Sequence, residues 1–135
     1  MKIALLFFIS LTSLANFTGK WSAQGFYESD RTSGECIEVF MQFKQTNISF
    51  MILDGGYICG EIQASYPPSK FTIVSDELFY GGEKVGMITK DKIEISYLEG
   101  VYNLNLQRNN GSVHFRELWK EEDDFLDIRA KLEEL

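Results

Sequence analysis

One acidic side chain occurs where the sequence pattern predicts an apolar interior. Between residues 84 and 119 alternate residues are mostly large and apolar, and Glu117 stands in that apolar row next to Trp119. A carboxylate inside a protein must be paired, hydrated or protonated, because burying an isolated charge is very costly. Glu117 therefore predicts contact with a polar or cationic group of a ligand, beside Tyr97, Tyr102 and Trp119. The structural alternative is a position at a wet rim, or a β-bulge that turns the side chain outward.

Catalytic chemistry finds little support in the sequence. A nucleophilic triad needs a base beside a serine or cysteine, and the single imidazole, His114, falls on the polar face of its predicted strand. The acidic run from Glu121 to Asp124 is typical of a solvated helix start rather than an acid–base pair. Two thiols and one imidazole do not make a spaced set of metal ligands. We therefore expect neither an enzyme nor a bound metal or cofactor.

Three two-residue turns position the residues of the acidic and aromatic face. They fall at Lys90-Asp91, Glu99-Gly100 and Asn110-Gly111, and they join four strands between Lys84 and Trp119 into a meander. A two-residue loop fixes the register of the strands that it joins, so each turn decides which residues share a face. The face predicted to be buried collects Ile88, Ile93, Ile95, Tyr97, Tyr102, Leu104, Leu106, Val113, Phe115 and Trp119.

The two cysteines give a geometric test of an earlier hairpin. If the strand ending at Gln45 folds back through a tight turn at Asn47-Ile48, Cys36 faces Cys59 and a disulfide joins the two strands. The competing turn at Asp54-Gly55-Gly56 would carry Cys59 too far away, and the cysteines would then be free thiols. We favour the bridge, with the glycine pair as a bulge or bend. Under this register one face collects Ile37, Val39, Met41, Phe43, Phe50, Ile52 and Ile58.

The rhythm of strands and turns predicts an all-β fold. About eight strands follow one another from residue 16 to 120 without a helical segment between them, so the sheet must be antiparallel. Eight tilted strands can close around an interior that is filled by side chains or holds one small ligand. We therefore expect an antiparallel up-and-down barrel of about eight strands over residues 16–120.

The last fifteen residues show a different period. Phe125, Ile128, Leu132 and Leu135 recur at spacings of three and four, after an acidic run that suits a helix N-terminus. This pattern predicts a C-terminal amphipathic α-helix over residues 121–135. Its apolar stripe either packs on the barrel or binds a protein partner, including a second copy of the chain.

The first fifteen residues predict export. Met1-Lys2 gives a positive start, an apolar run follows, and Ser13-Leu14-Ala15 offers small residues for cleavage, as in a secretory signal peptide. The apolar run is too short to cross a bilayer, and no other segment is long and apolar enough, so we expect no membrane span. A net charge of −7 disfavours nucleic acid and anionic lipid surfaces as partners. The expected location is secreted or periplasmic.

The chain also resembles a known superfamily at two points. Phe17-Thr18-Gly19-Lys20-Trp21 places a G-x-W at the start of the first strand, and Arg116 lies on the last predicted strand. This combination resembles the calycin superfamily of lipocalins, fatty-acid-binding proteins and avidins. The resemblance implies that Trp21 and Arg116 pack together across one end of the barrel, with a cation–π contribution. The predicted C-terminal helix is also lipocalin-like.

Taken together, the sequence predicts an exported, lipocalin-like barrel that binds a small, largely apolar molecule in its interior. The alternative is a barrel filled by its own aromatic side chains, which acts through its outer surface as an inhibitor, envelope or host-interaction protein. The residues expected to line the ligand site are Val39, Met41, Phe43, Tyr97, Tyr102, Leu104, Leu106, Phe115, Glu117 and Trp119.

Overall fold

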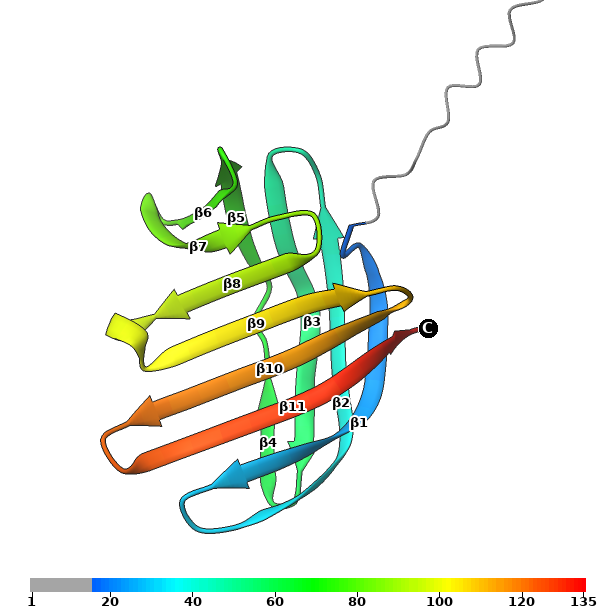
Figure 1. The fold of residues 1–135 in the computed structure, drawn as a ribbon, viewed down its shortest axis with the longest axis vertical. Helices are drawn as coiled ribbons and strands as arrows, with labels where there is room; N and C mark the ends of the chain where they lie inside the picture. The colour runs from blue at the N-terminus through cyan, green and yellow to red at the C-terminus, as the bar shows by residue number, and fades with distance from the viewer. Residues whose placement is uncertain (1–15) are drawn as a thin grey trace, which may run out of the picture.

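Eleven antiparallel strands make up a single sheet in the computed structural model, which describes residues 16–135, and ten of them close into a barrel (Figure 1). Within these residues the only helical element is the short 3-10 turn η1 (Leu98–Gly100). The strands are β1 (Gly19–Ser29), β2 (Ser33–Gln45), β3 (Ser49–Cys59), β4 (Ile62–Ser65), β5 (Ser69–Val74), β6 (Glu77–Tyr80), β7 (Glu83–Ile88), β8 (Lys92–Tyr97), β9 (Tyr102–Asn109), β10 (Ser112–Glu121) and β11 (Asp124–Glu134).

The barrel is an up-and-down arrangement with one addition. From β5 to β11 each strand pairs with the next, β11 pairs with β1, and β1, β2 and β3 follow in order. β3 then pairs with β5 through its first half and with β4 through its second half. The short β4 is therefore an extra strand beside β3, and β5 carries the barrel wall onward. The expected count of about eight strands is wrong, because β4, β6 and β11 add to it.

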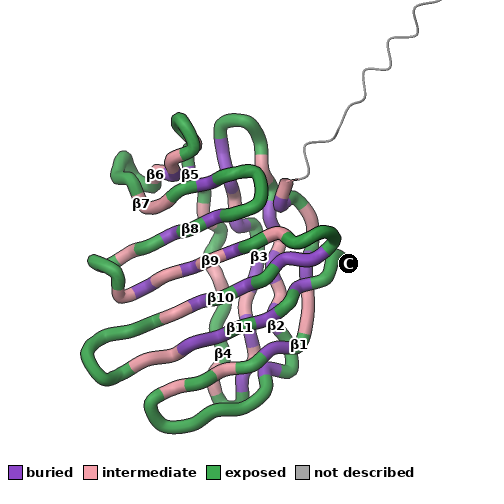
Figure 2. Tube along the Cα trace, viewed as in Figure 1, coloured by how far each residue is buried: buried purple, intermediate pink, exposed green. Residues whose placement is uncertain are grey.

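The meander over β7 to β10 has the register that its turns predict. Ile88 pairs with Ile93, Tyr97 with Tyr102, and Ser112 with Asn109, which centres the three turns where the sequence places them. Buried and exposed residues alternate along these strands (Figure 2). The predicted inner face is confirmed as far as Phe115, although Tyr97 is only half-buried. Trp119 at the end of β10 is 38% exposed.

The disulfide between Cys36 and Cys59 is confirmed, and it joins β2 to β3. The β2–β3 ladder has two irregularities, one between Cys36 and Glu38 and one between Gln42 and Phe43. In the stretch that they bound, the pairing differs from the register of a simple hairpin. The first irregularity turns Ile37 outward, so that its side chain is 69% exposed, and Tyr57 rather than Ile58 is buried on β3. The expectation that Ile37 and Ile58 share the core face is therefore wrong.

The glycine pair in β3 serves close packing and forms no hairpin turn. Gly55 and Gly56 lie inside the strand. A Cβ atom on Gly55 would lie 2.6 Å from the Met41 sulfur, and one on Gly56 would lie 2.3 Å from the Ala64 carbonyl oxygen. The neighbouring strands β2 and β4 can approach β3 this closely only because both residues lack a side chain.

The predicted C-terminal helix is wrong. Residues 124–134 form β11, which pairs with β10 on one side and with β1 on the other. Ile128, Ala130 and Leu132 are buried in strand alternation, while Leu135 is 78% exposed. Positions four apart share a face in a strand as well as in a helix, so Ile128 and Leu132 fit both patterns. Strand pairing decides between the two patterns. Without β11, the strands β1 and β10 would be edge strands with unpaired backbone N–H and C=O groups, and β11 supplies the hydrogen-bond partners.

The correction extends to the predicted domains and partners. Residues 121–135 belong to the barrel, so no helix is present there either to pack on the barrel or to bind a partner. The predicted signal peptide, residues 1–15, lies outside the described residues. Over residues 16–135, nothing helical has the length and apolar character that crossing a membrane requires.

Candidate functional site

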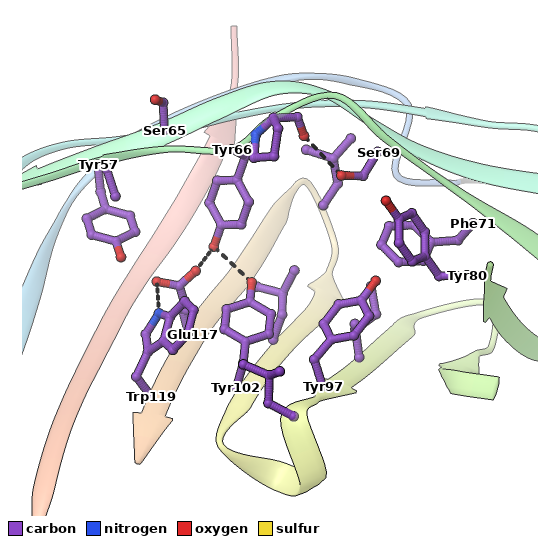
Figure 3. A pocket seen from close by; sticks show the side chains of 16 residues that line it. Tyr57, Ser65, Tyr66, Ser69, Phe71, Tyr80, Tyr97, Tyr102, Glu117 and Trp119 are labelled. Atoms are coloured by element: carbon purple, nitrogen blue, oxygen red, sulfur yellow. Dashed lines mark hydrogen bonds between the residues drawn. The ribbon is translucent and has the colours of Figure 1, made fainter. Parts of the chain in front are cut away.

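A cavity of about 410 Å³ opens on the barrel between the link from β4 to β5 and the connection from β8 to β9 (Figure 3). Its lining is mainly aromatic and aliphatic. The buried lining residues are Ile52, Tyr57, Phe71, Ile95, Tyr102, Leu104 and Glu117, and the partly or fully exposed ones are Ala64, Ser65, Tyr66, Pro67, Ser69, Tyr80, Tyr97, Leu98 and Trp119. The cavity therefore runs from the barrel interior to an aromatic rim.

The rim forms where the sheet is interrupted. Pro67 and Pro68 follow β4 and cannot donate ladder hydrogen bonds, and among the described ladders β4 pairs with β3 alone. The backbone amide of Tyr66 donates to the carbonyl of Gly55 at 2.8 Å, which holds the link against β3. From this anchored link the Tyr66 ring points across the cavity toward β9 and β10 (Figure 3).

Glu117 lies inside the barrel, at the centre of a hydrogen-bond network. It is 2% exposed and pairs with Leu104 in a β9–β10 ladder that has no register shift. Its Oε1 accepts a hydrogen bond from the Tyr66 hydroxyl, and its Oε2 accepts one from the Trp119 indole nitrogen at 3.1 Å. The Tyr102 hydroxyl donates in turn to the Tyr66 hydroxyl at 3.3 Å. The Glu117 side chain is therefore neither turned outward by a bulge nor placed at a solvent-exposed rim.

The hydrogen-bond partners of Glu117 are neutral. The lining of the cavity, drawn wholly from described residues, contains no lysine, arginine or histidine. The neighbouring Arg116 is on the outer face, where it donates to Asp127 at 3.0 and 3.1 Å. Among residues 16–135 the ion pairs within 4.0 Å use other carboxylates. Glu117 therefore brings a negative charge into an apolar cavity that supplies no cation.

The tyrosines around Glu117 stay protonated. Burial, and then the negative charge of Glu117, raise the pKa of Tyr66 well above its usual value. The same two causes raise the pKa of Tyr57 and of Tyr102. Burial, and then the nearby Tyr80, raise the pKa of Tyr97 to about 12. These phenols consequently act as hydrogen-bond donors over the whole physiological pH range.

The structure divides the predicted lining residues into two groups. Tyr97, Tyr102, Leu104, Glu117 and Trp119 line the cavity. The other five pack in the buried core without lining it: Val39, Met41, Phe43, Leu106 and Phe115.

The end of the barrel beyond the cavity is filled by aromatic side chains. Phe43 packs against Phe50 with ring centroids 5.3 Å apart, and against Phe17 at 6.4 Å. All three rings are almost completely buried. Aromatic side chains therefore fill one part of the barrel interior, and the cavity occupies another.

Sequence reasoning missed the residues that complete the site. Tyr66 lies in an irregular link, where no register assigns a direction to its side chain. Tyr57 follows the irregularities of the β2–β3 ladder, which move it to the inner face. The Pro67-Pro68 pair was the available signal, because it ends a strand and so opens the sheet beside Tyr66.

Trp21 and Arg116 do not come together. Trp21 is 2% exposed, and its indole nitrogen donates to the carbonyl of Phe17 at 2.9 Å. Arg116 is occupied by Asp127 on the outer face, and Arg129 donates to the same carboxylate. Arg108 instead reaches the N-terminal segment, where it donates to the carbonyl of Asn16 at 2.5 Å.

Fold and site together define a closed antiparallel β-barrel with an aromatic cavity and a buried carboxylate. No protein-family model matches the sequence, and no curated protein matches it.

Proposed function

We propose that this protein is an exported, calycin-like barrel that binds a small, largely apolar molecule in the cavity beside Glu117. The observation that carries the proposal is the cavity itself, with a volume of about 410 Å³ and a lining of aromatic and aliphatic side chains around one polar network. Ligand pockets in proteins commonly occupy about 300–1,000 Å³ and combine apolar walls with a few placed polar groups. The role is binding without catalysis.

Two features of the chain support export. The first fifteen residues have the charge and apolar pattern of a secretory signal peptide. The Cys36–Cys59 disulfide is compatible with an oxidising compartment, since the cytosol keeps most thiols reduced. A secreted or periplasmic location fits both features.

The binding proposal is tested with a neutral apolar fluorophore, N-phenyl-1-naphthylamine, whose emission rises in apolar surroundings. Ala64 lines the rim and is exposed, so Ala64→Trp narrows the cavity without disturbing the core. The neighbouring Gln63 is exposed as well but does not line the cavity, so Gln63→Trp is the matched control. We expect saturable binding to the wild type and to Gln63→Trp, and weakened binding to Ala64→Trp.

Two results would overturn the binding proposal. One is the absence of saturable fluorescence with folded wild-type protein. The other is equal affinity of the two tryptophan variants, which would place the fluorophore elsewhere. Either result would favour the barrel that acts only through its outer surface. Circular dichroism and thermal unfolding of both variants establish that each is folded.

A further inference from the structure

We infer that the ligand of this cavity carries a cationic nitrogen, a protonated or quaternary amine, which pairs with the Glu117 carboxylate among the surrounding aromatic rings. This inference rests on the proposed binding function and names the chemical class of its ligand. The arrangement of Glu117, Tyr57, Tyr66, Tyr102 and Trp119 is drawn in Figure 3.

The first argument is the missing counter-charge. Glu117 is 2% exposed, and each of its two oxygens accepts a hydrogen bond, one from Tyr66 and the other from Trp119. A carboxylate offers about four acceptor positions, so capacity remains for a further donor. Neutral donors orient the carboxylate without cancelling its charge, and the described lining supplies no cation. A ligand ammonium group would complete the site, because buried charges are normally paired.

The second argument is the aromatic rim. The rings of Tyr102 and Trp119 have centroids 4.6 Å apart, and Tyr97 continues the row at 5.9 Å from Tyr102. Tyr80 extends it toward the rim, at 6.0 Å from Tyr97. The faces of such rings attract cations and disfavour anions, and the attraction is largest where water is excluded. The row therefore favours a cation over an anion from the rim to the carboxylate.

The third argument is the apolar remainder of the cavity. Beside the polar network, Ile52, Phe71, Ile95 and Leu104 give a buried aliphatic and aromatic wall. This wall offers no hydrogen-bonding side chain, so the part of the ligand against it is a hydrocarbon or aryl group. The ligand class is consequently an amphiphilic monoamine, with one cationic nitrogen and one apolar body.

A purely structural role for Glu117 is the competing explanation. In that case the carboxylate only ties the β4–β5 link to β10 through Tyr66, and the charge of a ligand is irrelevant. The two explanations differ in a comparison that requires no variant. Probes that share a phenylethyl body but differ in charge should rank by charge in their affinity for the wild-type protein if the cavity senses charge.

The test is isothermal titration calorimetry of the wild-type protein with four phenyl compounds. They are 2-phenylethylammonium chloride, trimethyl(2-phenylethyl)ammonium chloride, the neutral 2-phenylethanol and the anionic 3-phenylpropanoate. We expect both cations to bind more tightly than the alcohol, by about tenfold or more, and the anion to bind most weakly. The quaternary probe cannot donate an N–H hydrogen bond, so its advantage over the alcohol does not come from hydrogen-bond donation by the nitrogen.

Glu117→Gln then assigns the preference to one residue. This variant keeps the side-chain shape, removes the charge, and should reduce the affinity for both cations to that for 2-phenylethanol. Glu38→Gln, at an exposed position on β2, makes the same change in net charge and should behave as the wild type. Tyr66→Phe keeps the carboxylate and removes one neutral donor, so it should retain the preference for cations.

The outcomes separate this inference from the binding proposal. If N-phenyl-1-naphthylamine binds the cavity but cations and alcohol bind equally, the site accepts apolar molecules and the cation inference is wrong. If Glu38→Gln lowers the cation affinity as much as Glu117→Gln does, overall charge rather than Glu117 is responsible, and the inference is again wrong. If no probe binds the folded protein, both proposals fall.

Discussion

Leu132 gives the sharpest test of how the barrel closes. Its side chain is fully buried on β11, opposite Val113 of β10, whereas Leu135, three residues later, is 78% exposed. A C-terminal helix would place both leucines on one apolar stripe. The strand places only Leu132 inside, so the same change, leucine to alanine, should have very different effects at the two positions.

The magnitude follows from burial. Leu132→Ala removes a fully buried side chain and leaves a space in the core, which typically costs about 2–5 kcal/mol of unfolding free energy. Leu135→Ala removes exposed atoms and keeps the backbone hydrogen bond from Leu135 to Lys20, so its cost should stay within about 0.5 kcal/mol. The total free energy of unfolding of a small domain is about 5–15 kcal/mol, so the loss expected for Leu132→Ala is a large fraction of it.

The assay is urea unfolding followed by circular dichroism, with the disulfide intact in every sample. The unfolding midpoint of Leu132→Ala should fall by about 1–3 M, and that of Leu135→Ala should not move measurably. Equal shifts for the two variants would refute the assignment of residues 124–134 as the closing strand.

Three further predictions concern the disulfide and the ionisable groups. Replacing Cys36 and Cys59 by alanine should lower the unfolding free energy by about 3.4 kcal/mol, from the chain entropy of a loop closed over 23 residues; an unchanged urea midpoint would contradict this. The raised pKa values of Tyr66 and Tyr102 stabilise the fold below pH 10, and this stability is lost as the pH rises through the pKa values of the folded state. The absorbance of ionised Tyr66 and Tyr102 should therefore appear only when the protein unfolds. Its appearance in the native protein would refute the burial argument. Burial opposes ionisation of Asp127, but two arginines outweigh this effect and lower the pKa of Asp127. The ionised Asp127 therefore stabilises the fold above its unfolded pKa, and this stability is lost as the pH falls through its folded pKa. Asp127→Asn should weaken the fall of the unfolding temperature at acid pH, and an unaltered fall would contradict this.

The parts of the fold that tight turns specify could be predicted from the sequence. Two-residue turns fix which residues oppose one another, so the inward position of Glu117 followed from its distance to the turn at Asn110-Gly111. The Cys36–Cys59 pairing also agrees with the register set by a single turn, because the two irregularities in the β2–β3 ladder offset each other. These conclusions needed only local chemistry and counting.

The remaining parts depend on contacts between distant segments. Ile128 and Leu132 satisfy both helical and strand periods, and only the open edges of β1 and β10 decide that they belong to a strand. Ile37 is turned outward by an irregularity in the β2–β3 ladder that no turn residue announces. Tyr66 lies 51 residues from Glu117 in the sequence, in an irregular link. No local pattern predicts the direction of its side chain, so only the structure could show that it contacts Glu117.

The two tryptophans provide the most direct measurement of ligand binding beside Glu117. The Trp119 indole N–H donates to Glu117 in the cavity, while the Trp21 indole N–H donates to Phe17 and lies outside the cavity lining. In nitrogen-15 correlation spectra, titration with 2-phenylethylammonium chloride should move the Trp119 indole resonance in a saturable way and leave that of Trp21 in place. An unmoved Trp119 resonance at saturating probe, or equal movement of both, would contradict the assignment of this cavity as the ligand site.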